Sequence, residues 1–300
     1  MTGHLHRRAR YIVVTPVRDE ARFIGDTIQS MLSQTHRPER WVIVDDGSTD
    51  RTPEILREQA EGVDWVTVVS TAARERKLGS AEVLAFQFGL ATIPANMTYD
   101  YVVKLDGDLR LPQDYFERLV ARMAANPRGG IYSGVYCELA NGEWGPVSMP
   151  GYHAAGASKV VHRQCFEQIG GFVARKGWDT VDEIRAGRRG WQTGHFDDIR
   201  FQHLKPEGAV MGALQTHRFH GDIYYQTGGG LVFLLAKVLH RMAWARPQLL
   251  GGLAMLWGYL VPMVRRRPRL VTDDEAAFYR ALLNRRLTGP VTRLLALVRS

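Results

Sequence analysis

Tyr101-Val102-Val103-Lys104-Leu105-Asp106-Gly107-Asp108 is the stretch that decides the fold and indicates the chemistry of this chain. It begins as a mostly apolar run, typical of a buried β-strand, and ends in two carboxylates separated by one glycine. Carboxylates in this position suit Mg²⁺ or Mn²⁺, which prefer oxygen ligands and often complete their coordination with substrate phosphates. The stretch therefore predicts a metal site that holds a nucleotide diphosphate, with a plain Asp-Gly-Asp turn as the alternative.

Alternating strand and helix patterns precede this stretch. Apolar, β-branched runs and segments with helical apolar spacing follow one another at residues 11–16, 24–32, 41–44, 52–60, 65–70 and 81–91. Strands of near-continuous apolar residues that alternate with helices indicate a mainly parallel sheet covered on both faces. We therefore predict an α/β fold whose ligands gather beyond the carboxyl ends of the strands.

Polar residues follow the strands of this predicted sheet. Thr15-Pro16 closes the first strand, Asp45-Asp46 the second, and Asp106-Gly107-Asp108 the fourth. Because the carboxyl ends of parallel strands meet at one edge, we expect these residues to face a single crevice. A glycine-rich phosphate loop does not follow the first strand, so a bound metal would have to neutralise the phosphates.

Four blocks of sequence, in this order, resemble the family 2 glycosyltransferases, which have the GT-A (Rossmann-like) fold. They are Thr15-Pro16-Val17-Arg18-Asp19-Glu20, Val44-Asp45-Asp46-Gly47-Ser48-Thr49-Asp50, Asp106-Gly107-Asp108, and Gly177-Trp178-Asp179 ahead of Gly190-Trp191. The resemblance spans about residues 10–205. It implies an inverting, metal-dependent transfer of a sugar from a nucleotide-diphospho-sugar to an acceptor hydroxyl.

The resemblance and the strand ends together suggest a donor site. The residues expected there are Thr15, Pro16, Glu20, Asp45, Asp46, Lys77 and Asp106. By resemblance, Thr15 and Asp46, with Asp45 beside it, would contact the nucleoside base. Asp106 would lie near the ribose, and Glu20 would support the first loop. Lys77 follows the third strand, where it could meet the diphosphate. Its Arg-Glu-Arg-Lys context is equally typical of an ordinary solvated run of charges.

Asp106, Asp108 and His203 are the expected metal ligands. The resemblance assigns the metal to Asp108 and a further metal or phosphate contact to His203, which lies downstream of Gly190-Trp191. A lone histidine after an apolar strand is also a common structural residue. The metal ligand set therefore depends on whether the fold brings His203 to the two aspartates.

Asp179 is the expected general base, because it lies eleven residues before Gly190, as the base does in family members. Those members have a glutamate before the base, whereas this chain has Trp178. Asp182 lies three residues on, so both carboxylates can share a helix face, and Asp182 is the alternative base. Helix capping and first-turn charge are the structural alternatives for the two aspartates.

The C-terminal region has a different composition from the rest. Residues 237–300 carry 12 Lys/Arg and 3 Asp/Glu, a net charge of +9. The whole chain has a net charge of +8, so residues 1–236 have a net charge of −1. Residues 247–264 are uncharged, and Arg265-Arg266-Arg267-Pro268-Arg269 follows. We predict a catalytic domain at 1–222 and a helical, membrane-associating extension at 223–300, which lies in or re-enters the cytoplasmic leaflet. Core helices packed on the catalytic domain are the alternative.

Membrane attachment would suit a lipid-linked or glycan acceptor at the cytoplasmic face of the cell membrane. Nucleic acid is not the expected partner, because the arginines flank apolar runs rather than stacking aromatics. Two rival functions remain at this point. A nucleotidylyltransferase also binds nucleotides on an α/β sheet, but its glycine- and arginine-rich first loop is missing. A non-catalytic relative would explain the absent glutamate before Asp179.

Overall fold

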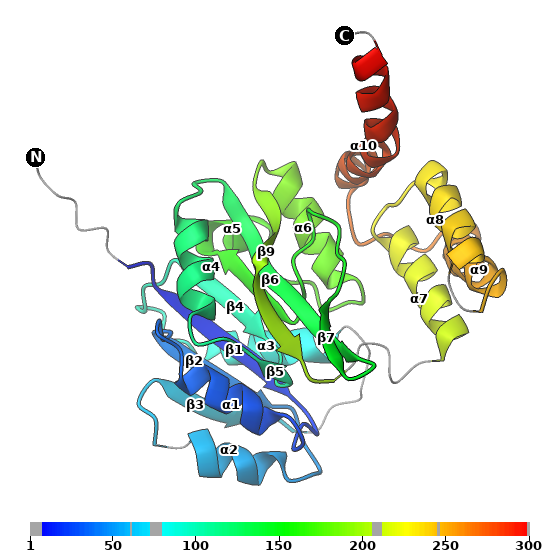
Figure 1. Ribbon diagram of the computed structural model, residues 1–300. Helices are drawn as coiled ribbons and strands as arrows, with labels where there is room; N and C mark the ends of the chain where they lie inside the picture. The colour runs from blue at the N-terminus through cyan, green and yellow to red at the C-terminus, as the bar shows by residue number, and fades with distance from the viewer. Residues whose placement is uncertain (1–7, 61, 73–79, 206–211, 245–246, 299–300) are drawn as a thin grey trace, which may run out of the picture. The chain divides into compact units, whose positions relative to one another are not determined.

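The central sheet of the N-terminal unit is built around the strand that ends at Leu105 (Figure 1). The computed structural model describes residues 8–60, 62–72, 80–205, 212–244 and 247–298. Two compact units divide the chain, at residues 1–206 and 207–300. The predicted boundary after Asp222 falls inside a helix, because the change in composition begins partway along that helix rather than at the break in the fold.

The N-terminal unit alternates strands and helices for most of its length. Its strands are β1 (Tyr11–Val17), β2 (Arg40–Asp45), β3 (Val66–Ser70), β4 (Tyr101–Leu105), β5 (Leu109–Arg110), β6 (Gly129–Ala140), β7 (Glu143–Pro146), β8 (Ser158–His162) and β9 (Gln192–His203). Its helices are α1 (Ile24–Leu32), α2 (Thr52–Ala60), α3 (Ala81–Ala91), α4 (Tyr115–Ala124), α5 (Arg163–Gln168) and α6 (Trp178–Arg188). The three helices predicted before the Asp-Gly-Asp stretch coincide with α1, α2 and α3.

The sheet has the strand order β3-β2-β1-β4-β8-β6-β9-β5, with β7 paired to β6. Parallel ladders join β3, β2, β1 and β4, and β6 is parallel to β9. The strand β8 runs antiparallel between β4 and β6, and β5 runs antiparallel to β9. The prediction of an α/β fold is therefore confirmed, and the ladders that join the first four strands are parallel as expected. The sheet as a whole is mixed, because β5, β7 and β8 run antiparallel to their neighbours.

Helices cover both faces of this sheet. Tyr11 and Val13 of β1 pack into one core with α1, α2 and α4. Ile12 and Val14 pack into a second core with α3, α5 and α6. Successive side chains of a strand point to opposite faces, so each strand end also sends neighbouring residues to opposite sides of the sheet. This alternation decides which of the predicted site residues can meet.

The C-terminal unit consists of helices in the described residues. They are α7 (Ala213–Gln226), α8 (Leu231–Trp244), α9 (Leu250–Val264) and α10 (Asp273–Val298). No helix in the described part of the chain is long and apolar enough to cross a membrane. The uncharged run at 247–264 contains the whole of α9. This helix packs closely on α7: a methyl group on Gly221 or Gly258 would come within 2.0 Å of a main-chain carbonyl oxygen of the facing helix.

Gly221→Ala or Gly258→Ala is expected to destabilise the protein, because the added methyl group meets a rigid carbonyl oxygen rather than a movable side chain. Overpacking of this kind costs about 1–3 kcal/mol, which the better helix propensity of alanine offsets only in part. Urea unfolding followed by tryptophan fluorescence measures the change. Gly145→Ala is the control, since its added methyl group meets nothing within 4 Å, and an equal loss in all three variants would contradict the close packing of α7 on α9.

Candidate functional site

The loops after β1 and β2 are joined by hydrogen bonds into one rim. The Asp19 carboxylate accepts hydrogen bonds from the Thr49 amide (2.7 Å) and hydroxyl (3.1 Å). The Glu20 amide donates to the Thr52 hydroxyl at 2.9 Å. Asp19 has a positive φ of 54°, a backbone conformation that aspartate tolerates better than most residues. The two sequence blocks therefore form a single preorganised edge of the site.

Alternation along the strands separates two predicted base contacts from the third. The Thr15 side chain is fully buried, and its hydroxyl accepts a hydrogen bond from Trp41 Nε1 at 2.9 Å. The Asp45 carboxylate, also buried, accepts one from the Ser48 amide at 3.0 Å. Both positions belong to the face covered by α1 and α2, whereas Asp46 turns to the opposite face. The structure therefore does not bring the side chains of Thr15 and Asp45 together with Asp46.

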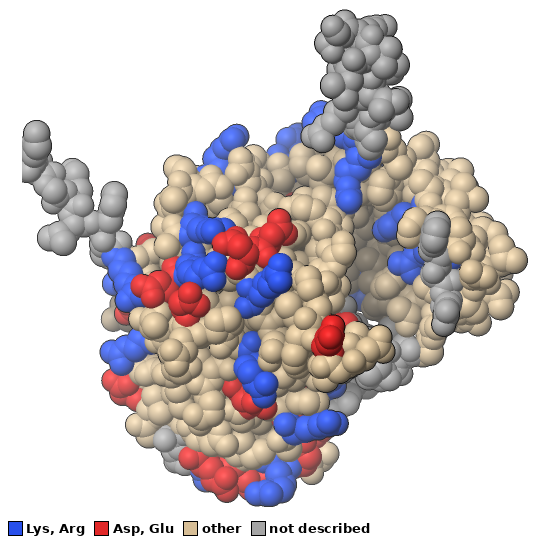
Figure 2. All heavy atoms as spheres, viewed as in Figure 1, with Lys and Arg blue, Asp and Glu red and all other residues tan. Residues whose placement is uncertain are grey.

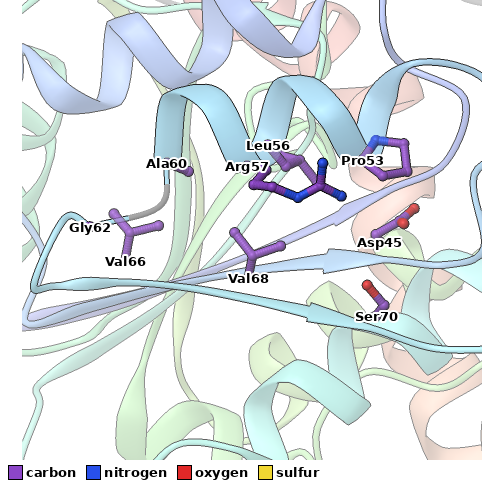
Figure 3. Close-up of a pocket in the computed structure, with 9 residues that line it drawn as sticks. All are labelled: Asp45, Pro53, Leu56, Arg57, Ala60, Gly62, Val66, Val68 and Ser70. Carbon is purple, nitrogen blue, oxygen red and sulfur yellow. The ribbon is translucent and has the colours of Figure 1, made fainter.

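Asp45 instead borders a cavity of about 330 Å³ between α2 and the outer strands of the sheet (Figure 3). Asp45 and Ser70 lie at one end of it, and Arg57 on α2 extends over Val68. None of these residues is a candidate metal ligand. The cavity is therefore lined by other residues than the candidate metal ligands.

The remaining donor-site candidates occupy the rim itself. Asp46 is buried, and one carboxylate oxygen accepts a hydrogen bond from the Thr71 hydroxyl at 2.6 Å. Pro16 is half-buried in β1. The Glu20 carboxylate forms an ion pair with Lys205 at 2.6 Å. Burial raises the pKa of Glu20, and Lys205 opposes this while the charge of Asp108 adds to it. Lys77 lies outside the described residues.

Asp106, Asp108 and His203 come together at the carboxyl end of β4. One ligand atom from each lies within 4.8 Å of the other two. His203 reaches the site because β9 pairs with β5, which places Leu109 opposite His203, and its Nε2 lies 3.5 Å from Asp108 Oδ2. The other Asp108 oxygen is buried and has no hydrogen-bond partner among the described residues. Two carboxylates, an imidazole and an unsatisfied buried oxygen suit a divalent cation such as Mn²⁺ or Mg²⁺.

Lys104 of β4 supports the carboxylate of Asp106, which directly follows this strand. Its buried ammonium group forms a short ion pair with Asp106 and a longer one, at 3.5 Å, with Glu82 of α3. Burial raises the pKa of Asp106 to about 7, because the opposing effect of Lys104 does not cancel it and the charges of Asp108 and Glu82 add to it. The other Glu82 oxygen accepts a hydrogen bond from Trp178 Nε1 at 2.7 Å. Glu82 therefore links the strand that carries Asp106 to the first residue of α6.

Asp179 lies in the first turn of α6, which begins after Gly177 in the left-handed conformation (φ 81°). Its side chain is partly exposed, and within the described chain its carboxylate makes no hydrogen bond. Asp182, by contrast, is only 1% exposed. Its carboxylate oxygens lie 3.1 and 3.2 Å from the Lys159 ammonium group. Burial raises the pKa of Asp182, with Lys159 opposing and the charge of Glu183 adding to the effect.

These contacts separate the two catalytic candidates. The spacing of Asp179 and Asp182 predicts one shared helix face, but the structure turns Asp182 into the core beneath α6, where Lys159 holds it. A base must reach the hydroxyl from which it takes the proton. Of the pair, Asp179 is the carboxylate with access to solvent.

Lys104 and Lys159 are directly opposite each other in the antiparallel pairing of β4 and β8. The Trp178 ring lies beside both ammonium groups, with its centroid 5.3 Å from Lys104 Nζ and 5.1 Å from Lys159 Nζ. Lys159 also donates to the Asp179 main-chain carbonyl at 2.8 Å. Trp178, which stands where family members carry glutamate, therefore fastens the start of α6 to the sheet.

Sequence reasoning missed this support for the site. Lys104 interrupts the otherwise apolar strand β4, and a lysine is almost never fully buried unless it is paired. That interruption was the available signal. Glu82 of α3 is a partner of Lys104, and Glu183 of α6 is a partner of Lys159. They lie 22 and 24 residues from these lysines in the sequence, so only the fold identifies them.

The sheet order, the strand-end carboxylates and the candidate metal ligands together define a GT-A fold, the class of nucleotide-sugar transferases. The family model for glycosyl transferase family 2 matches residues 12–190. The chain belongs to this family. The match covers β1 to the end of α6, so the metal-ligand candidate His203 lies beyond it.

Sequence similarity to curated proteins is limited to part of each chain. An undecaprenyl-phosphate 4-deoxy-4-formamido-L-arabinose transferase of Pectobacterium carotovorum is 32% identical over 111 residues, which are 36% of this chain and 32% of that protein. A poly-beta-1,6-N-acetyl-D-glucosamine synthase of Staphylococcus aureus is 28% identical over 116 residues, which are 39% of this chain and 26% of the synthase. The matched part spans about a third or less of these relatives.

Two solved structures share the fold over most of this chain. The S. aureus TarS 1–349 structure in complex with UDP-GlcNAc has a TM-score of 0.57 at 15% identity and covers 93% of this chain and 92% of its own. A Pyrobaculum calidifontis mannosyltransferase in complex with GDP-Man and Mn²⁺ has a TM-score of 0.55 at 18% identity and covers 96% of this chain and 81% of its own. At these identities the likeness concerns the fold.

Lys159→Met is expected to lower the free energy of unfolding by about 3–5 kcal/mol, because it removes one partner of a buried ion pair and leaves Asp182 and Glu183 without their cation. Arg163→Met is the matched control, since it breaks the exposed ion pair with Glu167 (2.9 Å), where a loss of about 1 kcal/mol or less is expected. Denaturant unfolding measures both variants. Similar losses of stability in the two variants would contradict the buried ion pairs of Lys159.

Proposed function

We propose that the chain is an inverting, metal-dependent glycosyltransferase that uses a nucleotide-diphospho-sugar. The single observation that carries the proposal is the group formed by Asp106, Asp108 and His203, whose ligand atoms lie within 4.8 Å of one another at the strand ends. Membership of family 2 supports the reaction class. The complexes of the two structural neighbours, with UDP-GlcNAc and with GDP-Man and Mn²⁺, support the type of donor.

On the donor side, Asp46 and the rim around Glu20 would hold the nucleoside, and Asp106 would meet the ribose or the metal. Asp108 and His203 would hold Mn²⁺ or Mg²⁺. When bound, the cation supplies charge neutralisation at the diphosphate leaving group. One oxygen of Asp108 is buried and has no hydrogen-bond partner among the described residues. This supports the assignment, because a buried oxygen without a partner lowers the stability of the protein unless a cation binds to it.

On the acceptor side, Asp179 would act as the general base. Its carboxylate takes the proton from the acceptor hydroxyl as that oxygen bonds to the anomeric carbon. The bond between this carbon and the diphosphate oxygen breaks, and its electron pair leaves with the nucleotide diphosphate. One base suffices for inversion, since no sugar is attached to the enzyme, and the burial of Asp182 against Lys159 supports the choice of Asp179.

The acceptor would be a lipid-linked sugar or a glycan at the cytoplasmic face of the cell membrane. The support is indirect: one curated relative is named for an undecaprenyl-phosphate substrate and another for polysaccharide synthesis. The basic composition of the C-terminal unit suits an anionic cytoplasmic leaflet. The donor sugar is not assigned by these residues, because pocket shape decides among similar sugars.

Asp179→Asn is expected to lower donor hydrolysis by about 10²- to 10⁴-fold with little change in donor affinity, because a general base contributes about that much to the rate. The assay measures hydrolysis of a panel of UDP-, GDP- and dTDP-sugars with Mn²⁺, followed by binding of the best donor to the variant. Asp197→Asn is the control, since that carboxylate is 92% exposed.

An unchanged rate for Asp179→Asn would contradict the assignment of the base. A wild-type chain that binds donors and never hydrolyses or transfers them would contradict the proposed activity and favour a non-catalytic relative. Activity only with a nucleoside triphosphate and a sugar phosphate would favour the nucleotidylyltransferase.

A further inference from the structure

The helix α9 exposes a continuous apolar stripe. Leu250, Leu253, Trp257 and Val264 are 53%, 50%, 59% and 76% exposed. At 100° per residue these positions fall on one side of the helix, whereas the glycines that touch α7 and α8 lie on the other side. A solvated helix normally carries polar residues on its outer side. The outer side of α9 is therefore built for an apolar environment.

The same feature recurs on the neighbouring elements of the C-terminal unit. A groove of about 760 Å³ runs between α7 and α9, lined mainly by leucines and Trp257. Helix α8 exposes Leu231, Val232, Leu235 and Leu239, each by more than half of its surface, again at positions that share one side. Monomeric soluble proteins rarely expose apolar surface on this scale, and patches of this kind mark protein or membrane contacts.

Charge identifies the partner. From Ile223 to Thr272 the chain has seven lysines and arginines and no acidic residue. Arg265, Arg266 and Arg267 follow α9 directly and are exposed. On the side shown in Figure 2, the surface over α7–α9 displays uncharged and basic side chains and no acidic ones. A second copy of this surface would face like charges, whereas an anionic lipid surface offers both an apolar layer and negative charge.

We propose that the stripe on α9, with the groove beside it, inserts into the interface of an anionic membrane leaflet. The leucines enter the acyl boundary, Trp257 lies at the headgroup level, and the three arginines after α9 contact lipid phosphates. The protein then binds one leaflet without crossing the bilayer, in keeping with the length of the described helices. This arrangement would hold a glycosyltransferase near acceptors that are themselves in the membrane.

Vesicle co-sedimentation of the full chain tests the proposal, with phosphatidylcholine vesicles that contain or lack phosphatidylglycerol. The wild-type chain is expected to sediment with the anionic vesicles and to bind the neutral ones at least about tenfold more weakly. Leu253→Gln/Trp257→Gln is expected to weaken binding to anionic vesicles by about tenfold or more, because it removes the inserted side chains. Arg265→Gln/Arg266→Gln/Arg267→Gln is expected to remove most of the dependence on anionic lipid.

Leu139→Gln/Trp144→Gln is the matched control, because this leucine and tryptophan are also exposed but lie on the β6–β7 hairpin. Binding equal to wild type is expected for the control. Donor hydrolysis in solution, measured on every variant, reports folding and keeps this proposal separate from the reaction: a chain without hydrolysis that still binds vesicles contradicts only the proposed function.

Three results would overturn the membrane proposal. The first is that the wild-type chain remains in the supernatant with anionic vesicles. The second is that Leu253→Gln/Trp257→Gln binds these vesicles as tightly as the wild-type chain. In the third, sedimentation equilibrium without lipid gives a stable dimer that this double variant dissociates, which assigns the surface to a second copy of the chain.

Discussion

The structure depends on two lysines that face each other inside the protein. Lys104 and Lys159 are opposite in the pairing of β4 and β8, and both are almost completely buried. Like charges opposite each other on a sheet repel, so the pair is stable only because carboxylates and the Trp178 ring surround it. Those partners come from α3 and α6 and from the end of β4. Neutralisation of the two lysines thus adds polar contacts to the apolar packing that holds both helices on the sheet.

This arrangement links the two halves of the candidate site. Lys104 pairs with Asp106, at the candidate metal site, and Lys159 binds the main chain of Asp179 and the carboxylate of Asp182. The distance between the proposed base and the proposed metal ligands is therefore fixed by the core of the sheet rather than by surface loops. Preorganisation of this kind lowers the cost of assembling a reactive geometry when substrates bind.

The fold was accessible from sequence because strand and helix patterns are local. The runs before Asp106 predicted α1, α2 and α3 and the strands between them, and the Asp-Gly-Asp stretch predicted a strand followed by carboxylates. The site was accessible only in part. Successive side chains point to opposite faces of the sheet, so Thr15 and Asp45 lie on the face opposite Asp46. The sequence alone does not say which residues face which of the two cores. The burial of Asp182 was hidden as well, because its partner Lys159 lies 23 residues earlier in the sequence, on strand β8.

Diffraction at the manganese absorption edge, from crystals grown with MnCl₂ and UDP or GDP, tests the central claim most directly. One anomalous peak is expected, in contact with a carboxylate oxygen of Asp106 or Asp108 and with His203, and with the diphosphate on its other side. An ordered nucleotide whose diphosphate lies away from these residues, or a manganese peak elsewhere with none at this position, would contradict it.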